Sequence, residues 1–227
     1  MKKFYYFLPI ILQKVGFFVF YTFHTVFVRI EVKGRENLVG LKKPIILASN
    51  HTSELDVTAS PLILGLFSPF YPIYYITDPK EKFKSFGWRN YLYGGIFFNI
   101  LGGYPVNSGF KDYEISLENF IDLIDKKNTI YIFPEGKRSV DGGLNPVRGG
   151  LGYLVYETGA TVVPIVIDTF FDMSWWKYFG MRRRVTINIL KPIKAEELII
   201  TNEPHLEEYK DVSRKVMKKI EEKMTPY

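Results

Sequence analysis

The chain of 227 residues contains no cysteine, and only three of its residues are histidines. Without cysteine it can form neither disulfide bonds nor a thiolate nucleophile, and zinc sites built on thiolates are excluded. His24, His51 and His205 are far apart in the sequence, so we expect no metal site. A Gly-x-Ser-x-Gly pattern is also missing, which argues against a hydrolase with a nucleophile elbow.

Internal repeats and low-complexity linkers are missing as well, and the length suits one α/β domain better than two. Apolar runs that suit strands alternate with helical patterns, which predicts a mostly parallel central sheet flanked by helices. In such a sheet, functional sites lie at the carboxyl ends of the strands. The expected strands are residues 26–32, 44–50, 73–77, 129–133, 161–167 and 185–190, and the expected helices are residues 57–64, 112–125, 148–157 and 205–224. Within residues 112–125, Ile115, Leu117 and Phe120 are expected to face the core.

The formal net charge is +6 and the isoelectric point is about 9.2. This charge is compatible with anionic partners such as phospholipid, a phosphorylated substrate or nucleic acid. No recognisable DNA-binding or RNA-binding module accompanies the charge, so we do not expect nucleic acid as a partner.

The N-terminal segment, residues 4–28, is nearly all apolar and contains no acidic residue. About 20 apolar residues are enough to cross a bilayer, but polar residues such as Gln13 and His24 interrupt this run. No small-residue cleavage site follows, which argues against a signal peptide. We expect residues 1–28 to be a membrane-anchoring segment, one long helix or two short ones lying in the interface, ahead of an α/β domain at residues 29–227. A single membrane span and a buried core helix are the alternatives.

Residues 170–179 form a second aromatic segment, which includes Trp175 and Trp176 and is followed by three arginines. Aromatic rings next to arginines are typical of a membrane interface. The segment therefore predicts a second contact with the bilayer, and a loop folded over the core is the alternative.

The first motif, Asn-His-Thr-Ser-Glu-Leu-Asp at residues 50–56, lies between an apolar strand and a helical pattern. His51 and Asp56 form the pair that general-base catalysis uses. The carboxylate accepts a hydrogen bond from one ring nitrogen and fixes the tautomer, which leaves the other nitrogen to take a proton. A competing interpretation is that Ser53 to Asp56 is only a capping box and that His51 packs nearby.

The second motif, Phe-Pro-Glu-Gly-Lys-Arg-Ser at residues 133–139, directly follows another apolar strand. Together the two motifs resemble the signature of the glycerolipid acyltransferases, in particular the 1-acylglycerol-3-phosphate acyltransferase family. The resemblance extends from about residue 44 to residue 167 and includes Val-Pro-Ile at residues 163–165. Two such motifs in this order are a specific signal.

The resemblance implies transfer of an acyl group from an acyl thioester to the free hydroxyl of a lysophospholipid. His51 would deprotonate the hydroxyl and Asp56 would hold the imidazole. The expected acceptor is 1-acyl-sn-glycerol 3-phosphate, which gives phosphatidic acid, and the expected donor is acyl-CoA or acyl carrier protein, without a further cofactor. Such an enzyme would be associated with the bilayer at the cytoplasmic face of the cell membrane.

The family also implies roles for the second motif in binding the acceptor. The matching positions are Glu135, Gly136, Arg138 and Ser139. The arginine is expected near the phosphate, because a guanidinium can donate two parallel hydrogen bonds to phosphate oxygens.

One block departs from the family pattern. Where the family commonly has Gly-x-x-Pro-Val-Asp-Arg, this chain has Asn107 and Ser108 as the last two residues. A serine cannot replace the charge of a guanidinium, so either Lys111 or Arg148 supplies the missing cation, or the acceptor has another headgroup. Acylation of another lysolipid or of glycerol 3-phosphate therefore stays open, as does a non-catalytic protein that binds lipid or remodels the bilayer on the same fold.

Overall fold

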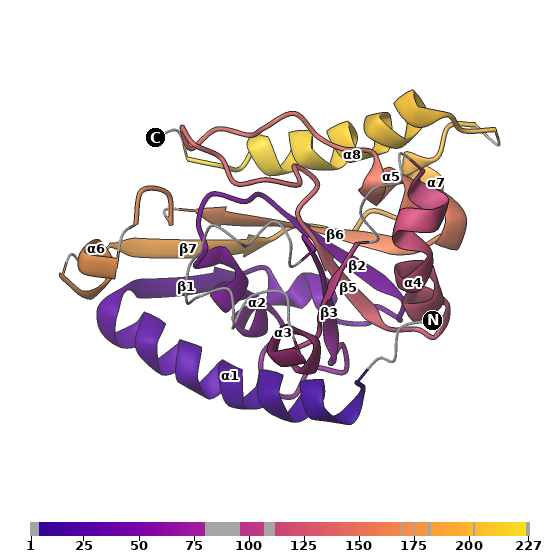
Figure 1. Cartoon of the computed structure of the whole chain (residues 1–227). Coiled ribbons are helices and arrows are strands. Elements are labelled where there is room, and N and C mark those ends of the chain that lie inside the picture. The colour runs from indigo at the N-terminus through magenta and orange to yellow at the C-terminus, as the bar shows by residue number, and fades with distance from the viewer. Residues whose placement is uncertain are drawn as a thin grey trace.

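The computed structural model describes residues 5–79, 96–106, 112–168, 170–173, 175–180, 183–201 and 203–225. These residues form one seven-stranded sheet with helices on both faces (Figure 1). The strands are β1 Arg29–Lys33, β2 Ile45–Ser49, β3 Ile73–Thr77, β4 Gly103–Pro105, β5 Thr129–Ile132, β6 Thr161–Asp168 and β7 Arg184–Ile189. Their order across the sheet is β1-β7-β6-β2-β5-β3-β4.

Neighbouring strands are parallel except for β6 and β7, so the prediction of a mostly parallel sheet is confirmed. Every residue of β2 and of β5 is buried. Such continuously apolar strands are typical of parallel sheets, which are covered on both faces. β2 and β5 pair directly, and this pairing brings the two sequence motifs to the same edge of the sheet.

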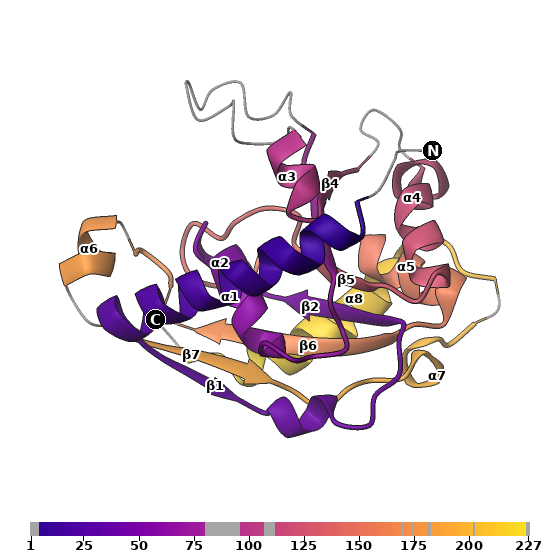
Figure 2. The ribbon, with the colours of Figure 1, turned by 90° about the horizontal axis from the view of Figure 1, so that it is seen from below.

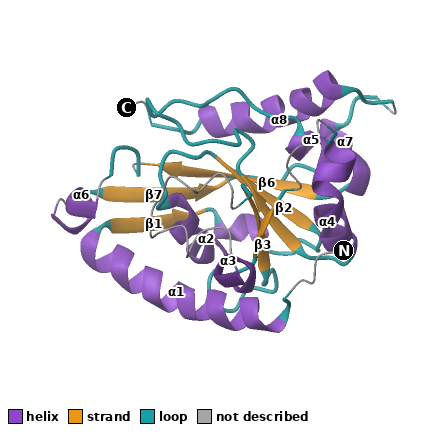
Figure 3. Cartoon of the chain, in the orientation of Figure 1, coloured by secondary structure: helices purple, strands orange, loops and turns teal. Residues whose placement is uncertain are grey.

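Helices cover the two faces of the sheet in separate groups (Figures 1 and 3). One face carries α1 Phe7–Phe27, α2 Asp56–Leu64 and α3 Ile96–Ile100. The other carries α4 Tyr113–Asp125, α5 Gly150–Thr158, α7 Ala195–Leu198 and α8 Leu206–Glu221. The short helix α6 Trp175–Gly180 lies beyond one end of the sheet, close to α1, and a 3-10 helix, η1, spans Arg35–Leu38.

Two apolar cores result from this arrangement, one on each face. Alternate residues of β2 enter different cores: Ile46 and Ala48 pack with α4, α5 and α8, whereas Ile45 and Leu47 pack with α2. This division follows from the two-residue period of a strand. Burial of an aliphatic side chain contributes about 1.5–3 kcal/mol, so both cores hold the sheet in place.

The N-terminal segment forms one helix, α1, which runs along the outside of the molecule (Figure 2). It is long and apolar enough to cross a membrane by length and composition, and only 11% of its most apolar stretch is buried. Exposed residues include Phe7 at 74%, Phe18 at 57% and Val26 at 54%. The alternative of a buried core helix therefore does not fit.

Two polar residues of α1, Gln13 and His24, face the protein. Gln13 accepts a hydrogen bond from the N–H of Ile73 (2.9 Å) and donates to the carbonyls of Ile73 (2.7 Å) and Leu101 (2.8 Å). His24 is 1% exposed, and its ring nitrogens lie 3.0 Å from the hydroxyl of Thr58 and 2.7 Å from that of Tyr178. Gln13 and His24 thus attach the helix to the protein, and many apolar side chains of α1 are exposed.

Two details of the sequence prediction were wrong. The first strand starts at Arg29 and not at Val26, because α1 continues through Phe27. Ile115 is 42% exposed. It lies two residues before Leu117, which puts the two side chains on opposite sides of a helix with 3.6 residues per turn.

Candidate functional site

The two motifs meet because the strands before them are parallel neighbours. Ala48 near the end of β2 is paired with Ile132 at the end of β5. The residues that follow, His51 in one chain segment and Phe133 in the other, therefore leave the sheet at the same edge. The candidate site is built at this edge, where the parallel topology predicts it.

His51 and Asp56 form the expected hydrogen bond. The distance from Nδ1 of His51 to Oδ2 of Asp56 is 3.0 Å. The carboxylate side chain is fully buried, while the imidazole is 17% exposed. Among the described residues no hydrogen-bond partner contacts Nε2 of His51, so this nitrogen is available to a substrate.

The turn around Asp56 does more than cap a helix. Oδ2 of Asp56 also accepts hydrogen bonds from the N–H groups of Thr52 (2.6 Å) and Ser53 (2.8 Å). The helix α2 begins at Asp56 with Leu55 as its N-cap, and the hydroxyl of Ser53 accepts from the N–H of Leu55 (3.2 Å). These bonds of Ser53 and Asp56 resemble a capping box, but Asp56 also bonds the imidazole, so the interpretation that His51 only packs nearby is wrong. The three donors fix the carboxylate against the imidazole.

Phe133 supports the imidazole from one side. The two rings are stacked, with their centroids 3.9 Å apart and their planes 16° apart. Sequence reasoning did not assign a role to Phe133, although its place at the start of the second motif is the signal that could have shown it. Stacking restricts rotation of His51 and complements the hydrogen bond to Asp56.

Glu135 holds the backbone of His51. Oε1 of Glu135 accepts from the N–H of His51 (2.9 Å), and Oε2 accepts from the backbone N–H (2.7 Å) and the side-chain Nδ2 (3.0 Å) of Asn145. Glu135 is 1% exposed. Burial raises the pKa of its carboxyl above the usual range, and the hydrogen bonds from Asn145 and His51 oppose that shift. Both oxygens face protein donors, which favours a positioning role over direct contact with an acceptor.

Ser139 holds the same backbone unit from the other end. Its N–H donates to the carbonyl oxygen of His51 (2.8 Å). Its hydroxyl donates to Asp141 (3.0 Å) and accepts from the N–H of Gly142 (3.0 Å), and the residue is buried. The second motif thus holds both the N–H and the carbonyl of His51, and Ser139 also has its hydroxyl turned to protein partners.

Gly136 and Arg148 lie against each other. Gly136 has a φ of +64°, in the left-handed region that glycine adopts without strain. A Cβ at this position would lie 2.7 Å from Nε of Arg148. The N–H of Arg148 donates to the carbonyl of Pro134 (2.8 Å). Arg148 is therefore a cation beside the second motif, whereas Lys111, Asn107 and Ser108 lie outside the described residues.

Arg138 reaches across to the first motif. Its Nη1 donates to Oε1 of Glu54 over 3.1 Å. The side chains are 45% and 33% exposed, and an exposed pair of this kind contributes about 0.2–1 kcal/mol. Sequence reasoning assigned Arg138 to the site and missed Glu54, which lies between His51 and Asp56.

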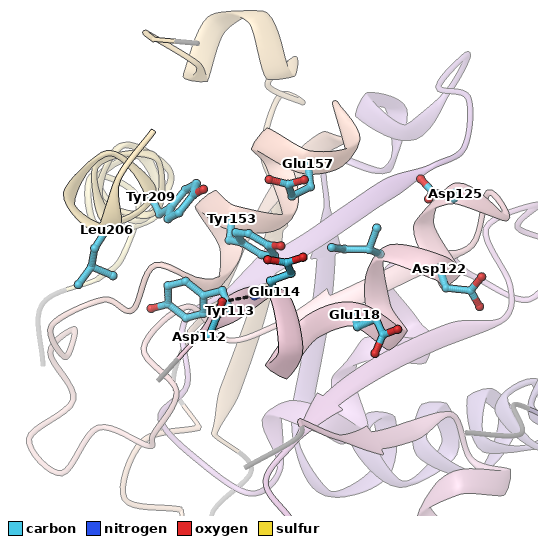
Figure 4. Close-up of a pocket in the computed structure, with 11 residues that line it drawn as sticks. Asp112, Tyr113, Glu114, Glu118, Asp122, Asp125, Tyr153, Glu157, Leu206 and Tyr209 are labelled. Carbon is cyan, nitrogen blue, oxygen red and sulfur yellow. Dashed lines mark hydrogen bonds between the residues drawn. The ribbon is translucent and has the colours of Figure 1, made fainter. Parts of the chain in front are cut away.

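A groove with a volume of about 1020 Å³ lies elsewhere, among α4, α5 and α8 (Figure 4). Its lining includes Tyr113, Tyr153 and Tyr209 together with acidic residues of α4. None of the lining residues belongs to either motif, and α4, α5 and α8 cover the face of the sheet opposite α1 and α2. We therefore do not include this groove in the candidate site.

Fold and site together define a class of protein. A mostly parallel sheet presents a histidine bonded to a buried carboxylate, and two arginines lie in the second motif or against it. This arrangement is typical of enzymes that use general-base catalysis on an anionic substrate. In the described part of the chain, no group of three or more His, Asp or Glu residues could hold a metal ion.

The chain matches the family described as Acyltransferase over residues 29–168. The match covers more than half of the 227 residues, and the chain therefore belongs to the acyltransferase family.

The chain is 31% identical over 176 residues to the 1-acyl-sn-glycerol-3-phosphate acyltransferase of Saccharomyces cerevisiae, covering 74% of this chain and 53% of that protein. It is 26% identical over 187 residues to the human 1-acyl-sn-glycerol-3-phosphate acyltransferase alpha, covering 79% and 60%. The chain spans about half the length of the curated relatives it matches. The crystal structure of the 1-acyl-sn-glycerophosphate acyltransferase PlsC from Thermotoga maritima has a TM-score of 0.62 and 24% identity, and the match covers 93% of this chain and 79% of that one. This likeness shows a shared fold.

Proposed function

We propose that this protein transfers an acyl group from an acyl thioester to the free hydroxyl of 1-acyl-sn-glycerol 3-phosphate and so forms phosphatidic acid. The observation that carries the proposal is the hydrogen bond of 3.0 Å between Nδ1 of His51 and Oδ2 of Asp56, inside the region that matches the family. The yeast and human relatives are named as 1-acyl-sn-glycerol-3-phosphate acyltransferases, which supports the choice of acceptor.

In the proposed reaction Asp56 accepts the Nδ1 proton of His51 in a hydrogen bond, which leaves Nε2 as the basic nitrogen. Nε2 takes the proton of the acceptor hydroxyl as its oxygen attacks the thioester carbonyl. The tetrahedral intermediate then expels the thiolate, which takes the proton back from the imidazolium. Proton transfer by a positioned base contributes about 10²–10⁴-fold to the rate.

For the acceptor phosphate, Arg138 and Arg148 are the proposed ligands. Both guanidinium groups lie beside the second motif, and both residues are exposed. Gly136 leaves room for the side chain of Arg148 beside the second motif, because a Cβ at this position would lie 2.7 Å from Nε of Arg148. Glu135 and Ser139 act indirectly by holding the backbone of His51. The family commonly has an arginine at the position of Ser108, and Lys111 is the alternative residue that could supply the missing positive charge.

The proposed donor is acyl-CoA or acyl carrier protein, and the proposed reaction uses no resident cofactor. The thioester is already activated, so the acceptor oxygen can attack it directly. This fits a chain in which cysteine is absent.

We further propose that the protein lies on the cytoplasmic face of the cell membrane through α1 and its neighbours. α3 and α6 each contact α1 (Figure 2). The exposed apolar side chains on them include Phe18 at 57%, Ile96 at 74% and Trp176 at 89%. A helix with its apolar side chains outward and its polar ones bonded inward is suited to burial in the headgroup and acyl boundary.

The experiment that tests the proposed function is acyl transfer by the purified protein in mixed micelles. The donors are acyl-CoA and acyl carrier protein thioesters, and the acceptors are 1-acyl-sn-glycerol 3-phosphate, other lysolipids and glycerol 3-phosphate. We expect phosphatidic acid as the main product. Transfer only to the other acceptors would replace the proposed acceptor, and no transfer from any donor would favour a non-catalytic lipid-binding protein.

A further inference from the structure

The ion pair between Glu54 and Arg138 connects the two motifs at the edge of the candidate site. Oε1 of Glu54 accepts one hydrogen bond of 3.1 Å from Nη1 of Arg138. Glu54 lies in the turn before α2, between the proposed base His51 and its partner Asp56. The carboxylate of Glu54 therefore contacts the guanidinium group of Arg138, which is the proposed ligand of the acceptor phosphate.

The position of the pair is fixed by the backbone on both sides. The residue after Arg138, Ser139, donates its N–H to the carbonyl of His51. Thr52 and Ser53 donate their N–H groups to the carboxylate of Asp56, which holds the turn that carries Glu54. These bonds hold the two chain segments that carry Arg138 and Glu54 next to each other.

We propose that Glu54 is a specificity-determining residue that competes with the acceptor phosphate for Arg138. The inference rests on the proposed function and deepens it. A phosphate can accept two parallel, charge-assisted hydrogen bonds from one guanidinium, whereas Arg138 donates a single one to Glu54 within the described part of the chain. Both partners are partly exposed, so their pair is weak and exchanges easily.

The competition has a defined consequence for selectivity. When a phosphate monoester takes over Arg138, the carboxylate of Glu54 remains nearby, and like charges repel each other. Glu54 therefore weakens binding of an acceptor with a doubly charged headgroup more than binding of one with a single negative charge. Glu54 contacts neither His51 nor Asp56 in the described hydrogen bonds, so the proton-transfer step does not depend on it.

The test compares the parent with Glu54→Gln, Arg138→Gln and the double variant. Glu118→Gln is the matched control, since it removes an exposed carboxylate on α4 and leaves the site unchanged. The readouts are KM and kcat for 1-acyl-sn-glycerol 3-phosphate and the calorimetric Kd for glycerol 3-phosphate, which needs no turnover. We expect Glu54→Gln to lower KM and Kd about three- to fivefold, within the range of an exposed ion pair, with kcat unchanged. In the Arg138→Gln background, Glu54→Gln should no longer lower KM or Kd. Glu118→Gln should have the KM, kcat and Kd of the parent.

An unchanged KM and Kd in Glu54→Gln would overturn the proposal. Raised values would also overturn it, because Glu54 would then hold Arg138 in place for the phosphate. A parent protein without acyl transfer would defeat the proposed function, and the calorimetric comparison would still decide the competition for Arg138 by itself.

Discussion

The N–H of His51 donates a hydrogen bond of 2.9 Å to the buried carboxylate of Glu135, 84 residues further along the chain. The second motif thereby sets the backbone position of the first. The imidazole then has its place defined by three contacts: Glu135 at the backbone, Asp56 at Nδ1 and Phe133 at the ring face. An imidazole that is held in this way would need little reorganisation to act as the proposed base.

Glu135→Gln should destabilise the fold and slow the reaction. The side-chain amide would turn an NH₂ group toward one set of N–H donors, those of His51 or of Asn145. An unsatisfied buried donor costs about 1–3 kcal/mol. The loss in unfolding free energy can be measured by urea unfolding monitored with circular dichroism. A variant as stable and as active as the parent would contradict the positioning role of Glu135.

Gly136→Ala should be more harmful than a change at another left-handed glycine. Gly136 and Gly40 have φ values of +64° and +78°, and alanine in this region costs about 1–2 kcal/mol. A Cβ at Gly136 would also meet Nε of Arg148 at 2.7 Å, whereas one at Gly40 has nothing within 4 Å. Only Gly136→Ala should therefore raise KM for the acceptor in addition to lowering the melting temperature. If Gly136→Ala and Gly40→Ala had equal effects on KM and on the melting temperature, the proposed role of Arg148 in acceptor binding would be contradicted.

Stability should fall as the pH is lowered from about 6.5 toward 4. Burial lowers the pKa of His24 to about 4 in the folded protein, while an unfolded histidine has a pKa of about 6.5. Between these values the unfolded chain binds a proton that folded His24 does not, so acid favours unfolding. Unfolding free energies measured at several pH values should show this slope in the parent, and His24→Gln should reduce it. An equal slope in both proteins would exclude His24 as its cause.

The outward face of α1, together with the neighbouring helix α6, should mediate binding to lipid vesicles. Phe18→Ser and Trp176→Ser should each weaken co-sedimentation with anionic vesicles and leave the melting temperature unchanged, since both side chains are largely exposed. These substitutions are sharper than deletion of α1, which would also remove the hydrogen bonds of Gln13 and His24 to the rest of the protein. If a variant with both substitutions bound vesicles as the parent does, the membrane contact would have to lie on another surface.

Six strands and the longer helices could be predicted from the sequence because each apolar run is local and distinct, whereas the short helices α3, α6 and α7 were not expected. The hydrogen bond between His51 and Asp56 could also be predicted, since a short turn brings the two residues together. The orientation of Glu135 could not, because it depends on the pairing of β2 with β5 and on Asn145, which no local pattern connects to it.

The attachment of α1 to the protein through Gln13 and His24 could not be predicted from the sequence either. Gln13 and His24 look like interruptions of an apolar run, and only their partners show that they attach the helix. Those partners, Ile73, Thr58 and Tyr178, lie in three other elements of the fold. Contacts of this kind arise from tertiary packing and have no signature within a single segment.

The most direct measurement is the rate of acyl transfer to 1-acyl-sn-glycerol 3-phosphate by the parent and by His51→Ala. The substitution leaves the N–H and carbonyl of residue 51 free to keep their bonds to Glu135 and Ser139, so the fold should survive, which circular dichroism can verify. We predict a fall in kcat of about 10²–10⁴-fold, with KM for the acceptor little changed. A folded His51→Ala variant that transfers acyl groups at the parent rate would contradict the general-base mechanism.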